Sequence, residues 1–234
     1  MKEKLNEYVL MVRDIKYAYG HDHKKEHAII LDIPCWTLEK GKSVFLHGES
    51  GSGKSTLLNL LSGMLLSKNG EINIAGTNLA ALNAQQRDRF RAEHIGVVFQ
   101  QFNLIPYLTV IDNVLLAANF ASGLSPEIEQ KAKELFAQVN LPESLYQQKA
   151  MSLSIGQQQR VAIARAFITR PKILFADEPT GNLDRTTGEQ VESLLFELNR
   201  ESATTLVLVT HDERLADRCD RRFKMTDGTL QEVS

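Results

Sequence analysis

The sequence predicts an α/β fold in which a glycine-rich loop joins a strand to a helix and a helical segment interrupts the sheet. Residues 48–56 read GESGSGKST and match the pattern G-x-x-x-x-G-K-[ST], with an apolar run at 43–47 before them and a helix-like run at 56–61 after them. Elsewhere, apolar strand-like runs alternate with helical patterns, as expected of an α/β core. Strand signals vanish over 101–170, where helical patterns dominate.

Local patterns predict the individual elements. β-Branched and aromatic residues indicate strands at 8–12 and 15–19, and Pro34 favours an edge position or a bulge for the strand at 28–33. Further strands are expected at 43–47, 70–76, 95–99, 172–177 and 204–210, and helices at 56–61, 84–92, 109–121, 126–139, 156–169 and 185–201. A short helix and a hairpin around Asp227 and Gly228 end the chain.

Length and composition are those of an ordinary globular protein. The chain has 234 residues, of which 43% are hydrophobic and 24% charged, and a formal net charge of −2, which argues against a basic nucleic-acid surface. No run approaches 18 apolar residues, and the N-terminus lacks a signal-peptide apolar region. Cys35 and Cys219 are far apart and show no metal-ligand spacing. A cytoplasmic protein is expected, unless a partner holds it at a membrane.

The glycine-rich loop is expected to bind phosphate. Glycines let consecutive backbone N–H groups form an anion-binding nest, and the following helix adds the positive end of its dipole. Lys54 is placed to reach the β- and γ-phosphates and the Ser55 hydroxyl to bind Mg²⁺, so the loop predicts ATP and Mg²⁺ as ligands. The residues assigned to this binding are Gly48, Ser50, Gly51, Ser52, Gly53, Lys54, Ser55 and Thr56. A glycine- and serine-rich turn is the alternative, which the flanking strand and helix disfavour.

Two carboxylates follow a second apolar strand. Asp177 is placed to hold Mg²⁺ through water, and Glu178 to polarise an attacking water. The alternative is that the two acids cap a helix. A separate cluster, His21, His23 and His27, fits either a metal site or, more simply, a solvated hairpin loop.

Residues 153–166, LSIGQQQRVAIARA, resemble the signature motif of ATP-binding-cassette (ABC) ATPases. The resemblance covers nearly the whole chain and implies a RecA-like core with an N-terminal antiparallel β subdomain and an inserted helical subdomain. Tyr19 then resembles the aromatic that stacks on adenine, Gln100 the glutamine-loop residue that binds Mg²⁺, Asp184 the D-loop residue and His211 the switch histidine. Together with Lys54 and Glu178, the resemblance makes Gln100 and His211 the catalytic candidates.

Three of these residues have simpler interpretations. Tyr19 fits a half-buried strand aromatic, Gln100 a polar residue at a strand end, and His211 a residue at a helix N-terminus beside Asp212. The domain interpretation is one ABC ATPase domain over 1–234, with its core at 1–100 and 171–234 and its helical subdomain at 101–170.

The signature implies that one chain carries half of each ATP site. By the family geometry, Ser154, Gly156 and Gln157 face the γ-phosphate bound by another copy, so that ATP binding closes a homodimer around two ATP molecules. The chain departs from the family at Ile155, where glycine is usual. Isoleucine is harmless there if its φ is negative.

Within the family, the cues at 98–104, 109–114 and 177–184 resemble LolD-like and MacB-like subunits, with FtsE-like subunits nearby. They imply ATP hydrolysis on the inner face of the membrane, powering export or lipoprotein release through a separate permease of MacB, LolC or FtsX type. An FtsE-like signal to cell-wall enzymes is the alternative. Leu104, Ile105 and Tyr107 are expected to receive a short helix of that permease. No nucleic-acid partner is expected. Soluble family members that act in translation generally carry two cassettes and those that act in repair carry coiled-coil inserts, whereas this chain has one cassette and no sustained heptad run.

Overall fold

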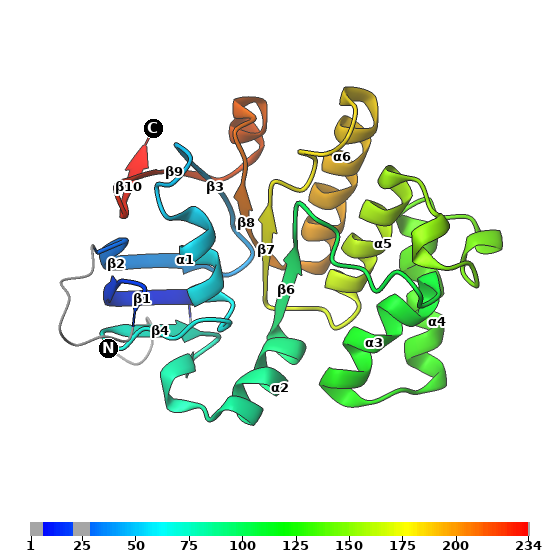
Figure 1. The fold of residues 1–234 in the computed structure, drawn as a ribbon, viewed down its shortest axis with the longest axis horizontal. Helices are drawn as coiled ribbons and strands as arrows, with labels where there is room; N and C mark the ends of the chain where they lie inside the picture. The colour runs from blue at the N-terminus through cyan, green and yellow to red at the C-terminus, as the bar shows by residue number, and fades with distance from the viewer. Residues whose placement is uncertain (1–6, 21–28, 234) are drawn as a thin grey trace. The chain divides into compact units, whose positions relative to one another are not determined.

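The computed structural model describes residues 7–20 and 29–233, which fall into two compact units (Figure 1). The first unit is Met1–Asp88 with Thr205–Ser234, and the second is Arg89–Thr204. The division falls within helix α2, Ala84–His94. The histidine cluster expected at His21, His23 and His27 lies outside the described residues.

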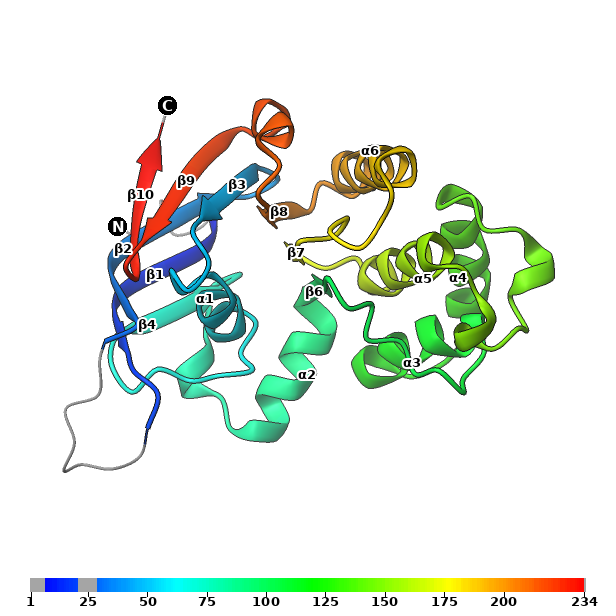
Figure 2. The ribbon, with the colours of Figure 1, turned by 45° about the horizontal axis from the view of Figure 1, so that its top comes forward.

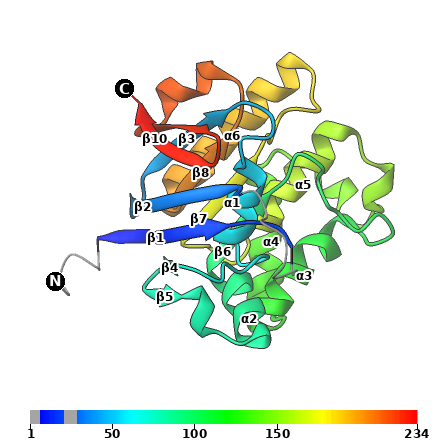
Figure 3. The ribbon, with the colours of Figure 1, turned by 60° about the vertical axis from the view of Figure 1, so that its left-hand side comes forward.

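One sheet of the first unit is antiparallel, with the strand order β2-β1-β4-β5. Its strands are β1 (Tyr8–Tyr17), β2 (Leu31–Glu39), β4 (Glu71–Ile74) and β5 (Thr77–Asn78). Figure 3 shows β1 and β2 side by side along much of their length. Pro34 lies in β2, which is the edge strand, so the missing N–H costs no ladder hydrogen bond and the edge prediction is confirmed.

The other strands of the first unit form a mixed arrangement in the order β10-β9-β3-β8. They are β3 (Ser43–Gly48), β8 (Thr205–Val209), β9 (Arg221–Thr226) and β10 (Thr229–Val233). Strand β3 runs parallel to both β8 and β9, and β9 turns back into β10 at Asp227 and Gly228, both with positive φ (Figure 2). Every residue of β8 is buried, as its continuous apolar sequence predicts.

Helix α1 (Lys54–Leu61) follows β3 and ends where the sequence predicts. Its apolar side chains Leu57, Leu60 and Leu61 are fully buried or nearly so, which fixes the helix in the first unit. Ser62 caps it, and Gly63 follows with a φ of +70°, which glycine adopts without a steric penalty. Two 3₁₀ turns complete the unit, η2 (Leu79–Ala81) and η5 (Glu213–Arg218).

The second unit places helices around a parallel strand pair, β6 (Ile95–Val98) and β7 (Ile173–Asp177). Its helices are α3 (Val110–Ser122), α4 (Pro126–Gln138), α5 (Ile155–Phe167) and α6 (Arg185–Ser202), with 3₁₀ turns η3 (Glu143–Leu145) and η4 (Ala150–Ser152). No strand lies between β6 and β7, a segment the structure describes throughout, so the switch to helical structure after residue 100 is confirmed.

Side-chain caps determine where these four helices begin. Thr109, Ser125, Ser154 and Asp184 each accept a hydrogen bond from the backbone N–H three residues later, which satisfies one of the free donors of a helix N-terminus. Each predicted boundary therefore lies within two residues of the observed one. Helix α5 packs against α3, α4, α6 and β6 and carries much of the unit's core. Over the described residues, no helix is long and apolar enough to cross a membrane.

Candidate nucleotide-binding site

Two glycines let the loop after β3 pass close to its neighbours. A Cβ on Gly48 would lie 2.4 Å from the carbonyl oxygen of Met225, and one on Gly53 would lie 2.8 Å from Leu31 Cδ2. Gly53 also has a φ of +105°, which L side chains rarely adopt, and it is the N-cap residue of α1. Any larger residue at either position would displace the loop from β2 or β9.

The first turn of α1 offers donors to an anion. Helix α1 has no side-chain cap, so its first backbone N–H groups have no partner within the helix. Lys54 Nζ donates to the carbonyl oxygens of Gly48 at 2.6 Å and Glu49 at 2.8 Å, which holds the ammonium over its own loop. Ser52 Oγ is buried and has no hydrogen-bond partner. These groups fit a phosphate, and the exposed Ser55 hydroxyl fits Mg²⁺, which prefers oxygen ligands.

Tyr19 lies beside the same helix. Strand β1 ends at Tyr17, and Tyr19 is 49% exposed, so the interpretation of Tyr19 as a half-buried strand aromatic is wrong. Its hydroxyl is 3.2 Å from Thr56 Oγ1, and its ring meets that of Tyr17 edge-on at 5.2 Å. An aromatic face held beside the phosphate loop can stack on a base.

His211 follows β8 in the same unit and is exposed. The cap of the next 3₁₀ turn is Asp212, whose carboxylate accepts the N–H of Arg214 at 3.0 Å, so His211 lies directly before this cap. Because β8 runs parallel to β3, residues that follow β8 emerge at the end of the sheet where the glycine-rich loop begins.

In the second unit, Asp177 ends β7 and Glu178 occupies the turn after it. Both are half-buried. The cap of α6 is Asp184, so the capping alternative for Asp177 and Glu178 is wrong. Glu178 has a φ of +45°, an uncommon conformation for a residue with a side chain, and such backbone strain concentrates at functional sites.

Gln100 is joined to the segment after Glu178. Asn182 Nδ2 donates to the carbonyl oxygen of Gln100 at 2.9 Å, and a Cβ on Gly181 would lie 3.1 Å from Gln100 Nε2. Gln100 is exposed and lies two residues beyond β6. Asp184, at the end of this segment, accepts the N–H of Thr187 at 3.0 Å, and its pKa is lowered by hydrogen bonds from Thr187. The capping bond keeps Asp184 ionised.

The N-terminus of α5 is closed by its own side chains. Ser154 Oγ accepts the N–H of Gln157 at 3.3 Å, and Gln157 Oε1 accepts the N–H of Ser154 at 3.0 Å, so the two form a capping box. Ile155 is the first helical residue, is not among those with positive φ, and is 52% exposed. Gly156 is the glycine with a packing reason, because its Cβ would lie 2.7 Å from Thr187 Cγ2.

Two polar side chains that the sequence did not single out join α5 to these segments. Gln159 is fully buried and its Nε2 donates to the carbonyl oxygen of Pro179, directly after the two acids. Arg165 donates to the carbonyl oxygens of Phe102, at 2.8 Å, and Asn103, at 2.5 Å, two and three residues after Gln100. Burial lowers the pKa of Arg165. Both lie within the signature-like segment, but periodicity alone does not distinguish a polar residue that bonds backbone from one on a solvated face.

The structure therefore assembles the predicted site residues in two groups. The first unit holds Tyr19, the loop at 48–56 and His211, and the second holds Gln100, Asp177, Glu178, Ser154, Gly156, Gln157 and Asp184. Over the described residues, no cluster of three histidine, cysteine or carboxylate side chains could hold a metal alone. That the two groups act together on one nucleotide remains a prediction.

Comparison with known proteins identifies the family. The family model described as ABC transporter matches residues 31–181. The chain is 46% identical over 226 residues to the ABC transporter ATP-binding protein YbbA of Escherichia coli K12, covering 97% of this chain and 98% of that one. It is 41% identical over 197 residues to the lipoprotein-releasing system ATP-binding protein LolD of Alcanivorax borkumensis, covering 84% and 86%.

Two further matches extend this likeness. The chain is 45% identical over 219 residues to the macrolide export ATP-binding/permease protein MacB of Rhodopirellula baltica, covering 92% of this chain and 31% of MacB. The dimeric ATP-binding cassette MJ0796, solved in a post-hydrolysis state with ADP and Pi, matches with a TM-score of 0.86 and 37% identity over 96% of this chain and 98% of that one. These findings confirm the predicted fold, ATP binding, ATP hydrolysis and the role of a transporter's ATPase subunit: the chain belongs to the ABC transporter family.

Proposed function

We propose that two copies of the chain bind two ATP molecules with Mg²⁺, and that their closure and hydrolysis drive a separate membrane permease that exports or releases its substrate. The observation that carries this proposal is the glycine-rich loop before α1, a helix N-terminus with no side-chain cap, and Glu178 after β7, with its strained backbone, supports it from the other unit. The first binds phosphate and the second activates water. The export or release role is supported by the likeness to LolD and MacB.

Each residue has a defined task in this proposal. Lys54 leaves the carbonyl oxygens of its own loop to bind the β- and γ-phosphates. The Glu178 carboxylate accepts a proton from the attacking water, and His211 donates to the γ-phosphate oxygens. Bound Mg²⁺ would supply positive charge that offsets the negative charge of the phosphates. Ser55, Asp177 and Gln100 supply the oxygen ligands that would hold it.

The signature residues complete the site of a second copy. Ser154 and Ile155 are exposed at the N-terminus of α5, where the positive end of the helix dipole favours an anion. Loss of the γ-phosphate after hydrolysis removes this anion, and the two copies separate. The dimeric state of the cassette MJ0796 supports this arrangement.

Substitution of Glu178 tests the hydrolytic role. Glu178→Gln keeps the size of the side chain but removes the base, so steady-state ATP hydrolysis should fall by at least about a hundredfold while ATP still binds. Glu197→Gln on α6, an exposed glutamate in the same unit, is the matched control and should hydrolyse ATP normally. Full hydrolysis by Glu178→Gln would contradict the assignment of the base.

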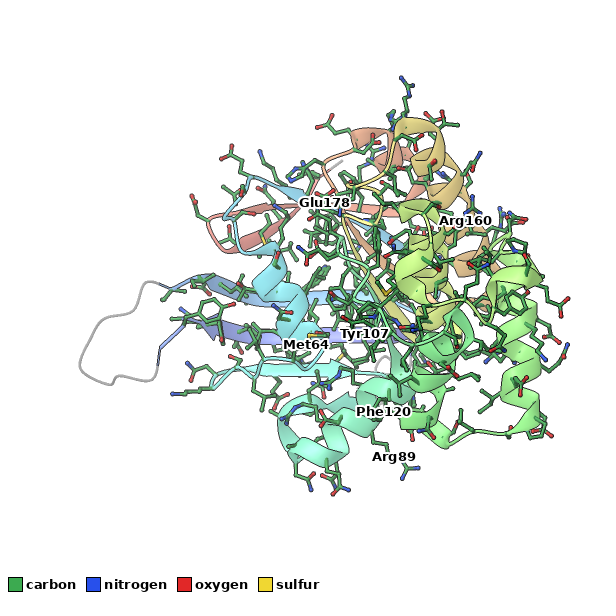
Figure 4. All side chains as sticks on the ribbon, turned by 45° about the vertical axis from the view of Figure 1, so that its right-hand side comes forward. Met64, Arg89, Tyr107, Phe120, Arg160 and Glu178 are labelled. Carbon is green, nitrogen blue, oxygen red and sulfur yellow. The ribbon has the colours of Figure 1, made fainter. Side chains whose placement is uncertain are left out.

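Exposed apolar residues mark the surface expected to meet the permease. Tyr107 is 74% exposed, Phe120 69% and Ile105 42%. Tyr107 and Phe120 are labelled in Figure 4. Asn113, at the start of α3, bonds both the N–H and the carbonyl of Ile105, which fixes the loop that carries Ile105 and Tyr107 against the helix that carries Phe120. We call Ile105, Tyr107 and Phe120 the docking patch. Leu104 was expected among them but is half-buried.

A short amphipathic helix on the inner side of a permease fits such a patch, because its apolar face can cover the aromatic rings. This docking would hold the chain at the cytoplasmic face of the membrane. Tyr107→Asp and Phe120→Asp should abolish copurification with the cognate permease, and Ile29→Asp, at an apolar residue 59% exposed in the other unit, should not. If the folded double variant Tyr107→Asp/Phe120→Asp copurified with the permease at normal yield, the assignment of the docking patch would be wrong.

A further inference from the structure

His47 lies directly before the phosphate loop, and the loop motif assigns it no role. It is the fifth residue of β3 and is half-buried, and its ring stacks on Phe45 with centroids 5.3 Å apart at 29°. Gly48, the first residue of the motif, follows it. Protonation of His47 would therefore place a positive charge directly beside the first residue of the phosphate loop.

The strands on either side of β3 bring further ionisable groups to this point. His47 is in register with Lys224 on β9. On the other side, the Thr210 N–H donates to the Leu46 carbonyl oxygen at 3.4 Å, so His211 emerges from β8 beside the end of β3. Since β3, β8 and β9 are parallel, their carboxyl ends lie at one edge of the sheet, which is where α/β proteins bind ligands.

Four ionisable groups from three neighbouring segments shift the pKa of His47. They are Lys54 from α1, Lys224 from β9, and His211 and Glu213 from the segment after β8. Lys54 Nζ bonds the carbonyl oxygen of Gly48, the residue next to His47. Burial lowers the pKa of His47, Glu213 raises it, and Lys224, His211 and Lys54 lower it further, so the net pKa is below its ordinary value. Without nucleotide, the imidazole is mainly neutral at pH 7.

The phosphates of ATP reverse this balance. They bring negative charge to Lys54 and the adjoining loop, and negative charge favours the protonated form of a histidine. Before ATP binds, Glu213 is the one group among the four that favours this form of His47. We propose that His47 is a proton-binding residue of the nucleotide site, which takes up a proton as the phosphates of ATP bind and so strengthens ATP binding as the pH falls. The proposal rests on ATP binding at the loop 48–56.

The sign of the effect follows from linkage. A group whose pKa is higher in the complex than in the free protein favours binding at pH values below the raised pKa and contributes nothing well above it. A rise of half a unit to one unit strengthens binding by about threefold to tenfold at low pH. The phosphates of ATP also titrate in this range, so only the difference between His47 variants reports on His47.

Calorimetric titration with ATP and Mg²⁺ measures this difference. The Glu178→Gln chain serves as the parent, so that ATP is not hydrolysed during the titration. Binding enthalpies measured at pH 6.5 in two buffers of different ionisation enthalpy give the number of protons taken up. His47→Leu and His47→Gln, made in that chain, should each take up fewer protons, by up to about half a proton. Their ATP affinity should also change less between pH 8 and pH 6, by up to about fivefold.

His94 provides the control. Burial lowers its pKa too, but it ends α2 and is not among the groups that shift the pKa of His47. His94→Gln should take up as many protons as the parent chain. Equal proton uptake by the parent and both His47 variants would overturn the proposal, as would a loss of affinity that is the same at every pH. Failure of the parent chain to bind ATP at any pH would instead overturn the proposed nucleotide site.

Discussion

Ile155 shows how a departure from a family pattern is resolved at the level of one residue. The sequence leaves open whether the position needs the positive φ that glycine permits. In the structure Ile155 begins α5 in a helical conformation with its side chain half in solvent, and Gly156 is the residue that must be small. Isoleucine is therefore compatible with the local backbone.

From this conformation we expect Ile155→Gly to change ATP turnover by less than about tenfold, or ~1.4 kcal/mol. Glycine at the first helical position costs α5 up to about 1 kcal/mol and adds no contact. A steady-state ATPase assay checks the expectation, with Met151→Gly, another exposed apolar residue before the same helix, as the control. A larger change would mean that Ile155 itself contacts ATP or the second copy.

At the scale of elements, α5 and α6 approach closely where Gly156 meets Thr187, and this contact predicts the effect of a larger residue at position 156. Gly156→Ala places a methyl group 2.7 Å from Thr187 Cγ2, and such overpacking costs about 1–3 kcal/mol, more than the helix propensity gained. The unfolding free energy in urea should fall. In a Thr187→Ser background, which lacks that methyl group, Gly156→Ala should cost nothing. A loss of equal size in both backgrounds would show that the contact is not the cause.

The start of β9 is held to the start of β3 by Asp220, which makes stability depend on pH. Its carboxylate accepts the Ser43 N–H at 2.7 Å, the Ser43 hydroxyl at 2.8 Å and Lys42 Nζ at 3.2 Å. Burial acts to raise the pKa of Asp220, but these hydrogen bonds outweigh it and the pKa lies below its ordinary value. The stability it contributes is present above about pH 4 and is lost as the pH falls through the lowered pKa.

Asp220→Asn should therefore lower the unfolding free energy at pH 7 by about 1 kcal/mol, because three charge-assisted bonds weaken and solvent screens the exposed part of the carboxylate. The gap between the native chain and the variant should narrow below about pH 4, where the native carboxylate becomes protonated. Urea unfolding curves from pH 7 down to pH 3 measure both. A gap that stays constant with pH would contradict the ionic contribution.

Some elements could be predicted from the sequence and others could not, for physical reasons. Caps such as Ser125 before Pro126 are local signals, so the helix boundaries of the second unit were predictable. The two-residue strand β5 was missed because so short a segment shows no periodicity. Likewise, the bonds of Gln159 and Arg165 to distant carbonyl groups depend on packing between segments, which a single sequence does not reveal.

At the scale of the whole molecule, the candidate site also combines features that have a local sequence signal with features that depend on packing between distant segments. The sequence of the loop 48–56 predicts phosphate binding because its motif is contiguous and specific. His47 adjoins that motif, yet its importance depends on β8 and β9 delivering ionisable groups from a segment more than 150 residues away in sequence. The assembly of two half-sites likewise lies beyond one chain, and only a measurement on two copies can test it.

The central claim is that ATP joins two copies of the chain, each completing the other's site. Light scattering on the Glu178→Gln chain with and without saturating ATP and Mg²⁺ tests it most directly. The account predicts a monomer without nucleotide and a dimer holding two ATP molecules with it, and no dimer once Lys54→Ala is added. A chain that binds ATP and remains monomeric, or a dimer that forms equally well without nucleotide, would contradict the account.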